Sequence, residues 1–133
     1  MILTTKGRYA VMAVIEIADA KNNQPVSLLT ISQQQKISLS YLEQIFSRLK
    51  KSGIVESVKG PGGGYILRKN HQEITIAEII KAIGEPIKMT RCGDTKKGCV
   101  TVSTKCKTHH IWHGLETNIY EYLNSISLGS ICK

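Results

Sequence analysis

The sequence predicts a mainly α-helical chain that carries one small β-hairpin. Several stretches repeat apolar residues at the spacing of one helix face, whereas a single pair of short β-branched runs flanks a glycine-rich loop. The 133 residues suit one domain or a little more, and a hydrophobic fraction of 41% supplies a core. These observations predict one compact helical unit with a hairpin attached to it.

Three helices are predicted in the first 53 residues. Ala10, Ala13, Val14 and Ile17 lie on one face of the first, within "TTKGRYAVMAVIEIADAKNN". A short helix is expected from Leu28 to about Gln35. A clearer one is expected from Leu39 to Lys51, and Gly53 stands just past its end as a stop signal. Two helices joined by a few residues, the second one longer, are typical of a helix-turn-helix.

A β-hairpin is predicted directly after these helices, because "IVESV" and "YILRK" flank the loop "KGPGGG". A nucleotide-binding loop would lead into a helix and, in its P-loop form, end in Gly-Lys-Ser or Gly-Lys-Thr. Neither feature follows here. A hairpin in this position is instead the wing of a winged helix, whose glycines permit positive φ angles and close approach to a partner.

The charge indicates a polyanionic partner. The net charge is +8, and the part up to Arg91 has 13 basic against 7 acidic residues (+6), whereas the remainder has 5 against 3 (+2). One face of the helix at 39–51 carries side chains of the kinds that contact bases and phosphates: Ser38, Ser40, Tyr41, Glu43, Gln44, Ser47, Arg48 and Lys51. An ordinary solvated helix face would have a similar composition. The positive charge makes nucleic acid the first expected partner and a membrane surface the second.

Two further helices are expected in the second half. One begins at Thr75, where Thr75 and Glu78 have the spacing of a capping box, and it stops at Gly84 and Pro86. The other lies within "HHIWHGLETNIYEYLNSIS" and has an apolar stripe: Ile111, Leu115, Ile119, Tyr122 and Ile126. That stripe packs either on its own domain or on a second subunit, and pairing with a second copy is the favoured alternative.

Between these helices lies a polar stretch, residues 90–108, with three of the four cysteines. Cys92, Cys99 and Cys106 are spaced C-x6-C-x6-C, and His109 follows. Thiolate and imidazole ligands suit zinc and iron–sulfur clusters alike. Structural zinc sites favour tight C-x2-4-C pairs, so the wide spacing favours a 2Fe–2S cluster. Two alternatives stay open: free reduced thiols, or zinc held by Cys106, His109 and His113.

Other function classes have little support. No motif supplies the pocket, oxyanion hole and orienting group that cysteine–histidine catalysis needs, so no enzyme is expected. No secretory signal and no run near ~18 apolar residues is present, which predicts a cytoplasmic protein without a membrane partner.

The segments "MILTTKGRYAVMA", "ISLSYLEQIFSRLKKSGIVESVKGPGGGYIL", "CKTHHIW" and "LNSISLG" together resemble the IscR family of iron–sulfur cluster regulators, which is related to nitric-oxide sensors such as NsrR and to cysteine-metabolism regulators. The resemblance implies a homodimeric winged helix-turn-helix transcription factor that binds double-stranded operator DNA and a 2Fe–2S cluster. It implies control of cluster-biogenesis genes, with cluster donor proteins as further partners. A zinc-, nitric-oxide- or thiol-responsive regulator of the same fold is the alternative.

The resemblance also implies site residues and a division of the chain. The cluster ligands would be Cys92, Cys99, Cys106 and His109. The DNA-binding residues would be Ser38, Ser40, Tyr41, Glu43, Gln44, Arg48, Lys59, Gly60, Pro61 and Gly62. The DNA-binding domain would span 1–89, the cluster-binding loop 90–108, and the dimerisation helix with the C-terminal tail 109–133. The chain departs from the family in having Lys36 where glycine is usual, Lys59 where arginine is common, and longer gaps between the cysteines.

Overall fold

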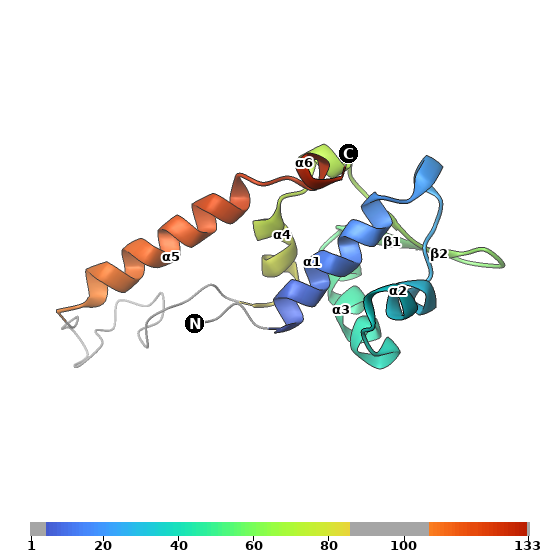
Figure 1. Cartoon of the computed structure of the whole chain (residues 1–133), viewed down its shortest axis with the longest axis horizontal. Coiled ribbons are helices and arrows are strands. Elements are labelled where there is room, and N and C mark those ends of the chain that lie inside the picture. Colours follow the sequence, from blue (N-terminus) through green and yellow to red (C-terminus); the bar gives the residue numbers. More distant parts are fainter. Residues whose placement is uncertain (1–4, 86–106, 133) are drawn as a thin grey trace.

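The computed structural model of the chain describes residues 5–85 and 107–132 (Figure 1). The elements in chain order are α1 (Thr5–Ala18), η1 (Lys21–Asn23), α2 (Leu28–Gln35), α3 (Leu39–Lys51), β1 (Val55–Val58), β2 (Gly64–Leu67), η2 (His71–Glu73), α4 (Ile76–Ala82), α5 (His109–Asn124) and α6 (Leu128–Ile131), where η marks a single 3-10 turn. The predicted class, mainly helical with one antiparallel hairpin, is confirmed. Across the described residues, no helix is both long enough and apolar enough to span a membrane.

The core is built around α3. Its inward side chains Leu42, Ile45, Phe46 and Leu49 are fully buried, and they belong to one cluster with residues of α1, α2 and α4. Full burial of one such side chain contributes about 1.5–3 kcal/mol. Because one face of α3 is committed to this core, the other face must point outward.

Serine and threonine side chains define where three helices begin. Ser27 Oγ accepts the backbone N–H of Thr30 at 3.1 Å, Ser38 Oγ accepts that of Tyr41 at 3.3 Å, and Thr75 Oγ1 accepts that of Glu78 at 3.2 Å. Each cap satisfies an N–H group that has no partner inside its helix. The cap at Thr75 is the one that the sequence predicts, and Ser38 fixes the start of α3.

The hairpin extends away from the helices as a wing (Figure 1). Its register pairs Val55 with Leu67 and Val58 with Gly64. Near the loop end of its ladder, Tyr65 of β2 exchanges two backbone hydrogen bonds of 2.9 and 3.0 Å with Val26. A Cβ atom on Gly64 would lie 2.3 Å from the Val26 carbonyl oxygen, so only glycine lets the wing approach this closely. The wing is thereby held to the chain that leads into α2.

Helix α5 projects from the body of the molecule, and the chain then returns to it (Figure 1). No residue of α5 is buried, and its last turn reaches the body through a 3.0 Å hydrogen bond from Thr75 Oγ1 to Asn124 Oδ1. The sequence predicts one long helix that includes Ile126. The structure corrects this, because the Ile126 carbonyl accepts the Ile76 N–H at 3.0 Å and the short helix α6 follows.

Candidate nucleic-acid interface

The outward face of α3 forms one wall of an open hollow of about 690 Å³. The lining residues are Lys6, Ser40, Glu43, Gln44, Ser47, Arg48 and Lys51. Four of the predicted DNA-binding residues, namely Ser40, Glu43, Gln44 and Arg48, therefore share one surface. Lys6 was not predicted, because only the fold brings the first turn of α1 beside α3. The lining combines hydroxyl, amide and cationic groups, which contact base edges and phosphates in protein–DNA complexes.

Two of the predicted DNA-binding residues at the N-terminal end of α3 also have structural contacts. Ser38 is the N-cap of α3, so its hydroxyl oxygen accepts a backbone hydrogen bond. The Tyr41 ring lies edge-on to Tyr9 of α1, with 5.9 Å between ring centroids, and it is half-buried. Both residues hold the N-terminal end of α3 in place, which orients Ser40 and Gln44.

Glu43 is the one acidic side chain that lines this hollow. Its spacing from Ser40 is compatible with a capping box, but α3 begins after Ser38, so Glu43 does not cap the helix. Glu43 also lines a neighbouring hollow of about 570 Å³, with Leu28, Ser47, Lys50, Lys51 and Tyr65. Within the described residues it forms no ion pair and is exposed. In protein–DNA complexes, carboxylates accept hydrogen bonds from cytosine N4, and their charge repels phosphate.

The wing places its predicted contact residues at an exposed tip. Lys59, Gly60, Pro61 and Gly62 are all exposed, and the φ angles of Gly60 and Gly62 are 96° and 75°. Behind the tip, Lys50 Nζ of α3 donates to Ser57 Oγ of β1 at 3.1 Å. The two predicted DNA-binding elements are therefore linked directly.

The predicted cluster ligands are only partly described. Cys92, Cys99 and Cys106 lie outside the described residues. His109 is the first residue of α5, and its ring stacks on that of His113 with 5.8 Å between centroids. Among residues 5–85 and 107–132, no group of three potential ligands is close enough to hold a metal ion. The ligand set, and the zinc alternative with His113, therefore remain predictions.

Cys132, which the sequence interpretation leaves out of the ligand set, follows helix α6. Burial raises the pKa of its thiol above the ordinary value, and Asp19 raises it further through its charge and by accepting a hydrogen bond. A raised pKa keeps a thiol protonated at neutral pH, and the protonated form is a poor nucleophile and metal ligand.

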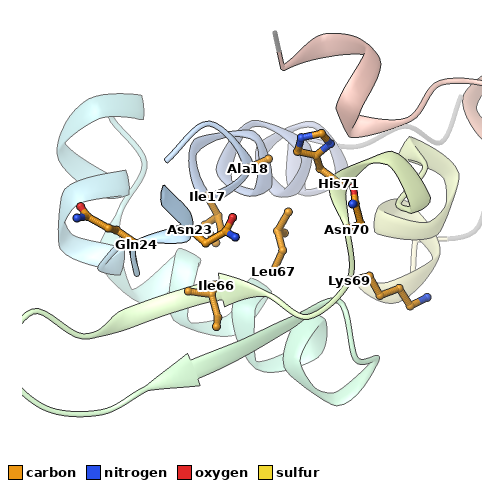
Figure 2. Close-up of a pocket in the computed structure, with 9 residues that line it drawn as sticks. All are labelled: Ile17, Ala18, Asn23, Gln24, Ile66, Leu67, Lys69, Asn70 and His71. Atoms are coloured by element: carbon orange, nitrogen blue, oxygen red, sulfur yellow. The ribbon is translucent and has the colours of Figure 1, made fainter. Parts of the chain in front are cut away.

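A third hollow, of about 450 Å³, lies between the end of α1 and strand β2 (Figure 2). The side chains of Ile17, Leu67, Asn70 and His71 are among those around it. Lys69 at its edge pairs with Glu78 at 3.6 Å, and the buried His71 Nδ1 has no hydrogen-bond partner in the part of the chain that the structure describes. None of the predicted site residues lines this hollow.

A helix-turn-helix with an exposed polar and basic second helix, followed by a basic wing, defines the chain as a winged helix-turn-helix transcriptional regulator. Residues 3–133 match the Rrf2 family, which is described as an iron-dependent transcriptional regulator, and the chain belongs to this family. Its role is regulation of transcription by binding DNA, and it is not an enzyme.

Relatives of similar sequence support this assignment. The chain is 49% identical over 131 residues to the HTH-type transcriptional regulator IscR of Escherichia coli strain K12 / DH10B, an alignment that covers 98% of this chain and 80% of the relative. The same protein of Klebsiella pneumoniae is also 49% identical, with 98% and 79% covered.

Solved structures of similar fold include two regulators. The IscR structure from T. potens has a TM-score of 0.78 and 33% identity, and covers 98% of this chain and 85% of that one. CymR, the global cysteine regulator of B. subtilis, has a TM-score of 0.82 and 30% identity, with 99% and 96% covered.

Proposed function

We propose that this chain is an iron–sulfur-cluster-sensing regulator that binds operator DNA as a homodimer and controls genes of cluster biogenesis. The observation that carries the proposal is the surface on which Ser40, Gln44 and Arg48 of α3 lie together with Lys6 and Lys51. This surface suits a major groove, and the exposed Lys59 suits an adjacent groove or backbone. Membership of an iron-dependent family supports the metal part of the proposal.

The proposed cluster site consists of Cys92, Cys99, Cys106 and His109. Three thiolates and one imidazole are a donor set that 2Fe–2S clusters accept, and the imidazole is a ligand that protonation can displace. The occupancy of this site would depend on how much iron and sulfide is available, so the bound cluster would act as the signal. His109 begins α5, so ligation through it would tie residues 90–108 to the helix proposed for dimerisation. Cluster donor proteins would then be transient partners.

The proposed dimer interface is the apolar face of α5. Ile111 is 61% exposed, Leu115 39% and Tyr122 66%, and Trp112 lies beside them. Four large apolar side chains on one projecting helix favour burial against another surface. A second copy of α5 offers a matching surface by two-fold symmetry. In this division of the chain, residues 1–89 bind DNA, 90–108 bind the cluster, and 109–133 form the dimer helix and tail.

Operator binding by wild type and variants tests the DNA part of the proposal. Gln44→Ala on α3 should lower affinity for a specific operator and leave non-specific affinity unchanged, because base contacts give specificity. Lys59→Ala should weaken both and reduce the slope of log affinity against log salt by about 1, because phosphate contacts release counterions. Lys21→Ala, a charge change at an exposed residue of η1 outside α3 and the wing, is the control. Equal effects of all three variants would contradict the assigned interface.

A second candidate is a thiol-responsive regulator of the same fold, because the similarity to CymR extends over 99% of this chain. Protein purified without oxygen distinguishes the two. A cluster regulator is coloured and contains iron and sulfide, whereas a thiol- or zinc-responsive regulator is colourless.

We predict that Glu43 restricts the choice of operators. Glu43→Ala should increase affinity for operators that lack a cytosine amino group opposite residue 43, because an acceptor-only carboxylate is removed from the groove surface. A gain of about 1–3 kcal/mol at such sites is expected from the usual cost of one mismatched contact. Fluorescence anisotropy on a panel of operators, with and without cluster, measures it. Glu43→Gln, which can donate as well as accept, is the control. Unchanged relative affinities across the panel would refute this role.

A further inference from the structure

Arg48 has a contact that its prediction as a DNA-binding residue does not explain. Its Nη1 donates a hydrogen bond to the carbonyl oxygen of Ile83, just past the end of α4, at 3.1 Å. Ser52, at the C-cap of α3, donates through its hydroxyl to the Ala82 carbonyl at 3.3 Å. The last carbonyls of a helix have no acceptor role inside it, so both bonds satisfy groups that the end of α4 leaves open. The two bonds hold the C-terminal half of α3 to the end of α4.

Gly84 makes room for this arrangement. Its φ angle is 78°, and a Cβ atom at this position would lie 2.5 Å from Arg48 Nη1. Any other residue would therefore be strained and would also displace the guanidinium. Gly53, at the end of α3, has almost the same φ of 79°, but a Cβ there would meet its nearest neighbour at an ordinary 3.7 Å. The two glycines have the same backbone requirement and differ in whether a side chain would disturb Arg48.

Arg48 also lines the hollow on the outward face of α3, together with Glu43 and Gln44. A guanidinium has five N–H donors, and the bond to Ile83 uses one of them. One side chain thus lies on the proposed DNA-binding surface and at the end of α4. The chain continues from there through Glu85 into residues 86–106, which contain Cys92, Cys99 and Cys106.

We propose that Arg48 is a positioning residue that couples the segment after α4 to α3, the helix proposed to contact DNA bases. A change in the segment beyond Glu85 would move the Ile83 carbonyl, and Arg48 would transmit the movement to the groove-facing side of α3. This inference rests on the proposed cluster-sensing function. It adds that the effect of the cluster would reach α3 from the end of α4 through Arg48. The simpler role, a phosphate contact alone, predicts different variant behaviour.

The test measures operator affinity with and without cluster, over a range of salt concentrations, for Arg48→Ala, Arg48→Lys and Gly84→Ala. All three should reduce the ratio of the two affinities by about fivefold. Lysine keeps the charge but not the planar fork, so it should not restore the ratio. Gly84→Ala should add little in an Arg48→Ala background, because both changes disrupt the same contact. Gly53→Ala controls for backbone strain, and Lys51→Ala controls for lost charge on the same surface. Both controls should keep the ratio.

A second measurement does not depend on the cluster. Hydrogen exchange in the cluster-free protein should speed up at the Gly84 and Glu85 amides in Arg48→Ala, but not in Lys51→Ala. The inference would be overturned if Arg48→Lys restored operator affinity in full, and if Arg48→Ala reduced the salt slope by about 1 but left the affinity ratio unchanged. Arg48 would then be a phosphate contact only. Wild-type protein that binds no cluster would overturn the proposed function and the coupling with it. The exchange result would still decide whether Arg48 holds α3 to α4.

Discussion

Lys36 shows how a single residue carries local strain in this fold. It ends α2 with φ 57° and ψ 44°, a left-handed conformation that glycine adopts without cost and that a residue with a Cβ adopts at a cost of about 1–2 kcal/mol. The neighbouring Ser32 hydroxyl donates to the Ile37 carbonyl at 2.5 Å, which fixes the turn into α3. The family resemblance leads one to expect glycine at this position, and the structure gives the reason.

We predict that Lys36→Gly stabilises the protein by about 0.5–1 kcal/mol, because the relief of strain exceeds the added entropy of the unfolded chain. Urea unfolding should show a higher midpoint with an unchanged slope. Lys36→Ala, which keeps the Cβ, should give no such gain. A urea midpoint for Lys36→Gly at or below that of Lys36→Ala would show that Lys36 is not strained in this conformation.

At the same scale, Cys132 should be a slow thiol. Its pKa is raised by burial and by Asp19, so at pH 8 its thiolate fraction, and its rate of alkylation by iodoacetamide, should be lower than for a free thiol. The rate should rise with pH and approach its plateau only above the ordinary thiol pKa. Asp19→Asn should speed the reaction at pH 8 in protein whose other cysteines are replaced by serine. An unchanged or slower alkylation rate in Asp19→Asn would show that Asp19 does not raise the pKa of Cys132.

At the scale of elements, the sequence is sufficient to predict a helix or hairpin where the signals lie within the element itself. The bounds of α2 and α3 were predicted as observed, because apolar spacing, the turn between them and Gly53 all lie within the segment itself. The hairpin followed from two β-branched runs around a glycine loop. Sequence reasoning missed Lys6 beside α3, the bond from Arg48 to Ile83 and the helix α6. The first two depend on contacts between residues far apart in the chain, and no local pattern encodes them. Helix α6 has a local start signal in its N-cap Ser127, but it is only four residues long and its place depends on the bond from Leu128 N to the Ile74 carbonyl.

Helix α5 is the element whose partner is least determined by the sequence. Its predicted stripe divides in two: Ile111, Leu115 and Tyr122 are exposed, whereas Ile126 packs against the core, as does the neighbouring Leu123. We predict that the double variant Ile111→Glu and Tyr122→Glu produces monomers, because four like charges would meet across a two-fold axis. Sedimentation equilibrium measures the change, with His110→Glu as a control for added charge. A variant that remains dimeric would place the interface elsewhere.

At the scale of the whole molecule, the arrangement links three parts in one order along the chain. The DNA-binding surface lies on α3 and the wing, and the end of α4 touches α3 through Arg48 and Ser52. The cysteines follow α4 in the sequence, and His109 begins the projecting α5. In the proposed regulator, ligand binding at 92–109 therefore acts between the DNA-binding unit and the dimer helix. Two-fold symmetry then predicts a nearly palindromic operator with half-sites about one helical turn apart.

The measurement that tests the central claim most directly compares wild type with Cys92→Ala, both purified without oxygen. We predict that the wild type shows visible absorption with about two irons and two sulfides per chain, as a 2Fe–2S centre requires. Its operator preference should change when the cluster is removed. Cys92→Ala should be colourless and should bind operators as the cluster-free wild type does, whereas Cys132→Ser should keep both colour and preference. Full colour in Cys92→Ala, or colourless wild-type protein with the same operator preference before and after chelation, would contradict the account.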